Sequence, residues 1–189
     1  MRCPLRGNQE GGVRVSQNIL VVYKKNFEDV HDEALEIVKN TLDGISNNIE
    51  IMVNYSAREK VSREDFIGRD LVVVLGGDGT LTSIAHSVDE NTPVMGVNSH
   101  PRDTDNDGSY GFYMGSDPIN FREDILKALS NEAIVNILPR LQAEISTTSG
   151  NVIRSDPALN DLLLANTHQY QPSKYKLQRK EDGKNSEIN

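Results

Sequence analysis

The chain has 189 residues, a formal net charge of −8 and an isoelectric point near 5.0. The negative charge argues against nucleic acid and anionic membrane surfaces as partners, and no apolar stretch approaches the roughly 20 residues that span a bilayer. The single cysteine, Cys3, excludes an internal disulfide and a cysteine-based zinc site, which favours a reducing, cytoplasmic setting.

Residues 1–17 contain three arginines and one acidic residue, and they lack the apolar core of a secretory signal. We expect a disordered N-terminal tail here. The arginine-rich, acid-poor composition is also compatible with import into mitochondria or another organelle.

Short apolar runs predict buried strands, and amphipathic segments between them predict helices. The expected strands are 18–23, 49–53, 71–75 and 93–97. The expected helices are 29–43 (ended by Gly44), one that begins after Thr80, and 117–129. This alternation predicts an α/β fold over residues 18–134, a doubly wound, Rossmann-like parallel sheet, and this segment is the candidate nucleotide-binding domain because it holds the glycine turn described below.

The pattern changes after about Ile134. Segments 137–145, 161–165 and 175–179 predict strands with no long helix between them, so residues 135–179 are expected to begin an all-β second domain. A few strands cannot close a sandwich or barrel, and the polar residues 180–189 predict a disordered tail. We therefore expect the second domain to be incomplete.

The strand 71–75 leads directly into the turn Gly76-Gly77-Asp78-Gly79-Thr80. Ligands of doubly wound sheets bind beyond the C-terminal ends of the strands, and glycine-rich turns before helices let phosphates approach the backbone. Asp78 would then accept a proton from an attacking hydroxyl or help to hold Mg²⁺. The alternative interpretation is a tight connection with glycines at positive φ and Asp78 or Thr80 as the helix N-cap.

Other polar residues are candidates for the same site. Asn98 follows the strand 93–97 and is expected at the same edge of the sheet. Asn160-Asp161 precedes an apolar run, where the pair would cap a turn or hydrogen-bond the hydroxyls of a ribose. Asp103–Gly108 matches the first half of a calcium loop, but Met114 stands where a bidentate glutamate is required, which favours an acidic solvated loop. The histidines lack metal-ligand spacing, so no metal-ligating residue is predicted.

Together these residues resemble the NAD kinase family. The matching segments are the turn Gly76 to Thr80, the strand end Gly96-Val97-Asn98, and Ala158-Leu159-Asn160-Asp161. The resemblance runs from about Asn18 to Leu177. Asn98-Ser99-His100-Pro101 and Pro172-Ser173-Lys174-Tyr175 look closest to the branch that contains plant NADH kinases and mitochondrial NAD kinases.

The resemblance implies ATP-dependent phosphorylation of the 2′-hydroxyl on the adenosine ribose of NAD⁺ or NADH, with Mg²⁺ or Mn²⁺ accompanying ATP. It also implies that Asp78 is the general base, and that Gly111-Phe112 corresponds to a Gly-Phe of the family. The residues implied to line the phosphates are Gly76, Gly77, Gly79 and Thr80, and those implied to hold the dinucleotide are Asn98, Asn160 and Asp161. A homo-oligomer is expected if the β-rich domain is completed.

Members of this family continue into a complete β-rich domain with further substrate contacts. One alternative is therefore a catalytically impaired, truncated isoform that acts as a nucleotide-binding or regulatory subunit. Another is a lipid kinase of the diacylglycerol type, which shares the glycine turn. An Asn-Asp pair that suits a sugar argues against the lipid kinase.

Overall fold

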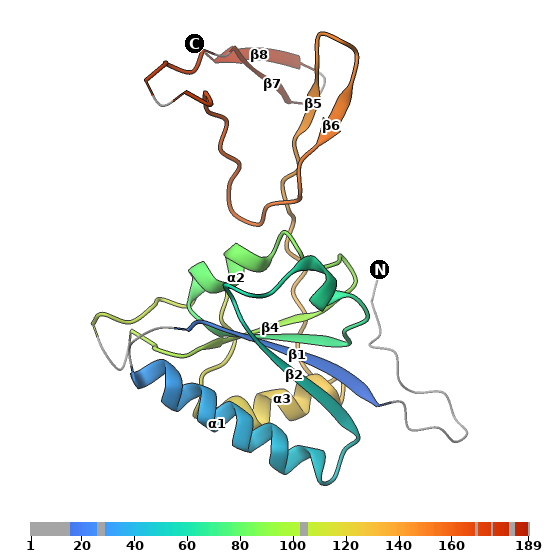
Figure 1. Cartoon of the computed structure of the whole chain (residues 1–189), viewed down its shortest axis with the longest axis vertical. Helices are drawn as coiled ribbons and strands as arrows, with labels where there is room; N and C mark the ends of the chain where they lie inside the picture. The colour runs from blue at the N-terminus through green and yellow to red at the C-terminus, as the bar shows by residue number, and fades with distance from the viewer. Residues whose placement is uncertain are drawn as a thin grey trace.

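The computed structural model describes residues 16–25, 29–102, 106–168, 170–174, 176–181 and 184–188. A four-stranded parallel sheet with the order β2-β1-β3-β4 forms its larger part. The strands are β1 (Gln17–Tyr23), β2 (Ile51–Ala57), β3 (Leu71–Gly76) and β4 (Val94–Asn98). Helices α1 (Asp29–Ser46) and α3 (Phe121–Leu129) cover one face, and α2 (Asp78–Ile84) and the 3₁₀ helix η1 (Arg63–Phe66) lie on the other (Figure 1). The predicted doubly wound α/β fold is confirmed.

The central strands β1 and β3 are buried on both faces because alternate side chains enter different helix layers. One layer, the α1 cluster, contains Ile19, Val21, Val73, Val38, Leu42, Phe121 and Ile125. The other, the α2 cluster, contains Leu20, Val22, Val72, Val74, Phe66, Leu81, Ile84 and Val88. The apolar runs that predict these strands therefore form the core of the sheet.

Several element ends differ from the prediction for identifiable reasons. Helix α1 continues past Gly44 to Ser46 because Ile45, only 3% exposed, packs in the α1 cluster. Strand β2 lies two residues later than expected at its start and extends to Ala57, since it pairs in parallel with all of β1. Helix α3 begins at Phe121 rather than Asp117, because the Asp117 carboxylate accepts the N–H groups of Ile119 and Asn120 in a preceding turn.

The β-rich segment differs more from the prediction. It contains two antiparallel pairs, β5 (Glu144–Ser146) with β6 (Val152–Arg154), and β7 (Leu177–Glu181) with β8 (Lys184–Ile188). The expected strand 137–145 is a strand only at its end, and 161–165 is irregular. The apolar side chains of 161–165, such as Leu163 at 92% exposed, pack against no other element in the described part of the chain. The apolar run therefore does not form a paired strand.

Strand β8 occupies residues for which the composition predicts a disordered tail, so that prediction is wrong for 184–188. The signal that was missed is Asp182-Gly183, a dipeptide typical of two-residue hairpin loops, which separates β7 from β8 in the sequence. The boundary between the two expected domains stays a prediction. The expected N-terminal tail falls outside the described residues, apart from residues 16 and 17.

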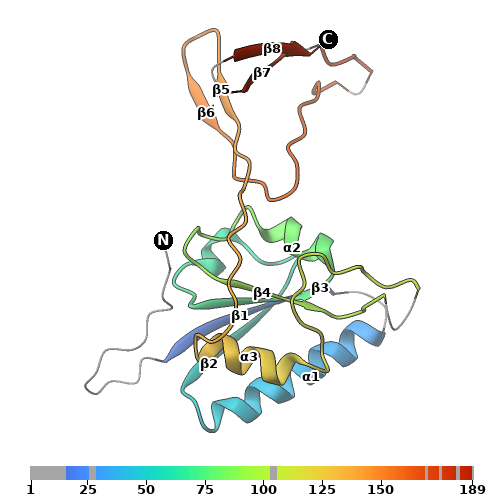
Figure 2. The ribbon, with the colours of Figure 1, turned by 180° about the vertical axis from the view of Figure 1, so that it is seen from behind.

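Specific contacts join the segment after α3 to the α2 side of the sheet. The Arg140 guanidinium donates to the carbonyls of Ala85 and Val88, each at 2.7 Å, and Leu159 packs against the α2 cluster. From there the β5–β8 segment extends away from the sheet, as both views show (Figures 1 and 2). Within the described ranges, no helix combines the length and apolarity needed to cross a membrane.

Two isoleucines near α3 provide a matched test of the core. Ile125 is 0% exposed in the α1 cluster, whereas Ile119, just before the helix, is 86% exposed. We expect Ile125→Ala to lower the free energy of unfolding by about 2–5 kcal/mol because it leaves a cavity, and Ile119→Ala to change it by less than about 0.5 kcal/mol. Denaturant titration followed by circular dichroism measures both, and equal effects would contradict the packing described.

Candidate functional site

The structure brings the glycine turn and Asn98 together at the C-terminal edge of the sheet. Gly76 and Asn98 are register partners at the ends of β3 and β4. The N–H of Ser99 then donates to the Gly76 carbonyl at 3.0 Å, which keeps the two chains adjacent beyond the last paired residues. The site is therefore built where two parallel strands end side by side.

Close packing explains two glycines of the turn. A Cβ at Gly76 would overlap the Oγ1 of Thr80, and a Cβ at Gly77 would lie 2.8 Å from the Oγ of Ser109. None of the three glycines has a positive φ, and Gly77 (φ −111°) is the N-cap of α2 without a side-chain cap bond. The alternative interpretation, with positive φ and Asp78 or Thr80 as the cap, is therefore wrong: both residues lie inside α2.

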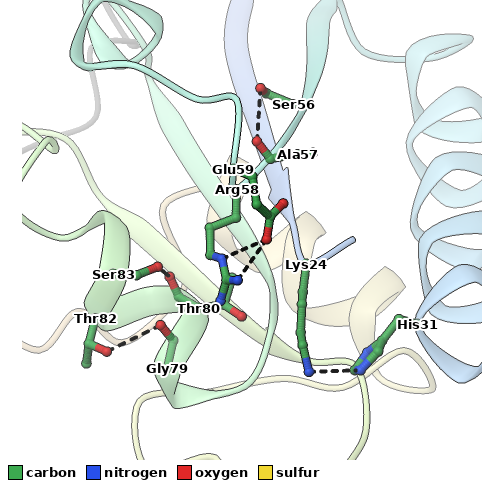
Figure 3. Close-up of polar contacts among 10 residues, drawn as sticks. All are labelled: Lys24, His31, Ser56, Ala57, Arg58, Glu59, Gly79, Thr80, Thr82 and Ser83. Carbon is green, nitrogen blue, oxygen red and sulfur yellow. Dashed lines mark hydrogen bonds and ion pairs between the residues drawn. The ribbon is translucent and has the colours of Figure 1, made fainter. Parts of the chain in front are cut away.

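Gly79 differs from the other two glycines, because a Cβ there would meet no atom of the described residues within 4 Å. Gly79 is exposed, and its carbonyl accepts a long hydrogen bond from the Thr82 hydroxyl, at 3.4 Å (Figure 3). Thr80 beside it is 2% exposed and packs back on Gly76. The turn thus presents bare backbone at Gly79 on a buried, rigid base.

The Asp78 carboxylate is anchored by backbone amides from a distant loop. The N–H of Phe112 donates to Oδ2 at 3.0 Å, and the N–H of Tyr113 donates to Oδ1 at 2.8 Å. A carboxylate can accept about four hydrogen bonds, so about two acceptor positions of Asp78 stay available. This arrangement fixes the direction of the carboxylate and leaves it able to accept a hydroxyl proton or contact a cation. Every residue except proline carries a backbone N–H, so no residue type in the sequence marks this contact.

The Asn98 side chain holds the same loop in place through two hydrogen bonds. Its side chain is 6% exposed, its Nδ2 donates to the Ser109 carbonyl at 3.1 Å, and its Oδ1 accepts the N–H of His100 at 3.3 Å. Gly111 approaches this amide so closely that a Cβ would lie 2.7 Å from Nδ2, and its φ of +70° also favours glycine. Asn98 therefore positions the loop that anchors Asp78.

Aromatic side chains on this loop are exposed next to the carboxylate. Tyr110 and Phe112 stack with ring centroids 5.7 Å apart, and the Arg102 guanidinium lies 4.3 Å from the Tyr110 ring centroid. Phe112 is 83% exposed. An open groove of about 470 Å³ lies between this loop and α3, and its lining includes Asn98 and Gly111 but not Asp78.

Basic side chains follow the two neighbouring strands. Lys24 follows β1, where its N–H donates to the Leu75 carbonyl at 3.0 Å, and Arg58 follows β2. The Arg58 guanidinium donates twice to Oε1 of Glu59, at 3.1 and 2.7 Å. A hydrogen bond from the Glu59 backbone N–H is the main cause that holds the pKa of Glu59 below its usual range, and the Arg58 guanidinium contributes less. Sequence reasoning missed both cations because single basic residues after strands form no motif.

The structure does not place Asn160 and Asp161 as close to the glycine turn as it places Asn98. Both side chains are exposed. Leu159, directly before them, packs against the α2 cluster together with Tyr113 and Met114, which continue the loop that anchors Asp78. The first half of the acidic loop, residues 103–105, lies outside the described residues.

The donor set suits a magnesium ion that arrives with phosphates. Asp78 offers free acceptor positions, while the described residues contain no group of three or more histidine, cysteine, aspartate or glutamate side chains able to hold a metal. Mg²⁺ is commonly bound through one or two carboxylates plus substrate phosphates and keeps several waters. Asp78 fits that limited contribution.

Comparisons with known proteins agree on one family. The model of the ATP-NAD kinase N-terminal domain matches residues 18–132. The NAD kinase of Pseudomonas fluorescens is 34% identical over 96 residues, which are 50% of this chain and 29% of that protein. The NAD kinase of Clostridium beijerinckii is 28% identical over 142 residues, 73% of this chain and 45% of that protein. The NADH kinase of Arabidopsis thaliana is 53% identical over 32 residues, 17% of this chain and 10% of that protein. The chain thus spans less than half the length of these relatives.

Two aspartates that each anchor backbone amides provide a matched test of the site. Asp78 accepts the amides of Phe112 and Tyr113, and Asp117 accepts those of Ile119 and Asn120. We expect Asp78→Ala to speed hydrogen exchange at Phe112 and Tyr113 only, and Asp117→Ala to do so at Ile119 and Asn120 only, because each loses its own acceptor. Amide exchange measured by NMR distinguishes the two, and protection at Phe112 that survives Asp78→Ala would contradict the anchoring.

Proposed function

The chain belongs to the ATP-NAD kinase family, and from this premise we propose that it binds ATP and a nicotinamide adenine dinucleotide at the C-terminal edge of its sheet. The reaction is transfer of the γ-phosphoryl group to the 2′-hydroxyl of the adenosine ribose, which gives NADP⁺ or NADPH. The observation that carries the proposal is the Asp78 carboxylate, held by two amides beside the bare backbone of Gly79.

Asp78 is proposed as the general base. The ribose 2′-oxygen forms a bond to the γ-phosphorus, the bond from that phosphorus to the β,γ-bridging oxygen breaks, and ADP leaves. The proton of the hydroxyl passes to a free oxygen position of Asp78. When bound, Mg²⁺ supplies positive charge to the phosphates. Catalysis of this kind depends mainly on positioning, which the fixed direction of the carboxylate supports.

The glycine turn is proposed to receive the phosphates. Gly76 and Gly77 are required by internal packing, with Thr80 and with Ser109 respectively. Gly79 has no such requirement in the described residues, so its lack of a side chain is best explained by the approach of a ligand.

The dinucleotide is proposed to lie against the loop that follows β4. Asn98 contributes by holding this loop, since both ends of its amide are already hydrogen-bonded. The exposed Asn160 and Asp161 are available for ribose hydroxyls or a nicotinamide amide. Both NAD⁺ and NADH fit this description, because the proposed contacts do not involve the ring carbon that differs between them.

A second candidate function is nucleotide binding without turnover. The observation that favours it is the exposure of Asn160 and Asp161, which leaves the dinucleotide side of the site more open than the phosphate side. An assay for NADP(H) formation separates the two functions, because only the kinase forms this product.

Substitution of Asp78 tests the reaction. We expect the chain with ATP, Mg²⁺ and NAD⁺ or NADH to form NADP(H), and Asp78→Asn to reduce the rate by about 10²–10⁴-fold through loss of the proton acceptor. Asp70→Asn is the control, since Asp70 also accepts a backbone amide, that of Asn18, but lies before β3 at the opposite end of the sheet. A coupled assay with an NADP-specific dehydrogenase measures the product. ATP binding without any NADP(H) would establish the second candidate, and an unimpaired Asp78→Asn would remove Asp78 as the base.

A pair of glycine substitutions tests the phosphate contact. Gly79→Ala is expected to leave the melting temperature unchanged, since its Cβ meets open space, but to weaken ATP binding. Gly77→Ala is expected to lower the melting temperature, because its Cβ would lie 2.8 Å from the Ser109 Oγ. Calorimetric titration with ATP and thermal melting measure the two effects. Full ATP affinity in Gly79→Ala would show that the phosphates lie elsewhere.

A further inference from the structure

Lys24 and Ser99 stand on opposite sides of the start of the glycine turn. Strand β3 lies between β1 and β4 in the sheet. Lys24 follows β1 and donates its backbone N–H to the Leu75 carbonyl, and Ser99 follows β4 and donates its own to the Gly76 carbonyl, both at 3.0 Å. The two residues therefore flank the point where the chain leaves the sheet to form the turn.

The buried ring of His31, on α1, links the side chains of these two residues. His31 is 6% exposed, its Nδ1 lies 2.7 Å from the Ser99 Oγ, and its Nε2 lies 3.5 Å from the Lys24 Nζ. An ammonium group can only donate, so Nε2 is the acceptor in the contact with Lys24. The Ser99 hydroxyl holds the other ring nitrogen, so the imidazole links Ser99 to the ammonium group.

Lys24 follows β1 next to the point at which the sheet reverses its order. Strand β1 is followed by α1 on one face, and β3 is followed by α2 on the other. Ligands of doubly wound sheets bind at this switch point. Figure 3 shows the end of the Lys24 side chain against the His31 ring.

Charge distinguishes Lys24 from its neighbour Arg58. Arg58 donates twice to a carboxylate of Glu59, which balances its charge. Lys24 contacts an imidazole nitrogen rather than a carboxylate among the described residues, so no ion pair there balances its charge. A polyphosphate next to the Asp78 carboxylate requires such a charge, because the chain is otherwise acidic.

We propose that Lys24 binds the polyphosphate of the donor nucleotide, and that His31 and Ser99 are positioning residues for its ammonium group. This inference rests on the proposed function in one respect, since it takes the turn from Gly76 to Thr80 as the phosphate site. It adds the residue that follows β1 and a residue on α1 to a site otherwise formed by the ends of β3 and β4, the start of α2 and the loop after β4.

Binding of ATP and of adenosine to the whole chain tests this proposal. Lys24→Met removes the charge and keeps the apolar stem, so we expect the Kd for ATP to rise about 10-fold or more and that for adenosine to change less than about 2-fold. Lys39→Met is the matched control, because Lys39 lies on the surface of α1 and pairs with Glu36. In turnover, Lys24→Met should raise the KM for ATP and leave the KM for NAD⁺ unchanged.

The positioning role is tested in a double-mutant cycle. The buried His31→Gln keeps an acceptor near Lys24 but loses the bond to Ser99, and Ser99→Ala removes the same bond from the other side. Both should raise the Kd for ATP by less than Lys24→Met does, and His31→Gln should have no further effect in the Lys24→Met background. A purely structural role of His31 would lower affinity in both backgrounds. Thermal melting of each variant confirms that it folds.

The outcomes separate this inference from the proposed function. ATP binding that depends on Lys24, without formation of NADP(H), supports the inference and contradicts the kinase. NADP(H) formation with a normal KM for ATP in Lys24→Met supports the kinase and overturns the inference. Equal losses for ATP and adenosine also overturn the inference, and a wild-type chain that binds no ATP overturns both.

Discussion

The position of β3 between two parallel neighbours is the constraint on which the site depends. Because β1 and β4 are both hydrogen-bonded to β3, the residues that follow the three strands are brought to one edge of the sheet. The turn cannot move away from this edge without cost, since Thr80 packs directly on Gly76 and Ser109 packs on Gly77. This close packing is possible because Gly76 and Gly77 carry no side chains.

Asp78 and Lys24, the charged groups at this edge, are not held by a charged side chain of opposite sign among the described residues. Two backbone amides orient the Asp78 carboxylate, and an imidazole orients the Lys24 ammonium group. A direct ion pair would cancel both charges, as happens between Arg58 and Glu59 at the neighbouring strand end. The arrangement therefore keeps one negative and one positive group oriented and available, which suits a site that must bind phosphates and accept a proton.

Local apolar runs made the sheet predictable. The runs in β1 and β3 are continuous because both faces of these strands are buried, and the ligand edge then follows from general rules for such sheets. Element ends were less predictable because they depend on distant packing, as with Ile45, or on a side chain, as with Asp117. The partners of Asp78 lie 34 and 35 positions away and are plain amides, and His31 and Ser99 are 68 positions apart. No motif joins such residues.

The anchoring of Asp78 couples chemistry to the shape of the loop. The amides of Phe112 and Tyr113 bind best to a fully ionised carboxylate, since a carboxyl group that takes up a proton is a weaker acceptor. One side chain at the start of α2 therefore sets the position of two successive backbone amides, 34 and 35 positions along the chain. A ligand that drew the Asp78 side chain out of this direction would also shift the backbone that carries the exposed Phe112 ring, so the carboxylate and the aromatic face of the loop cannot be repositioned independently.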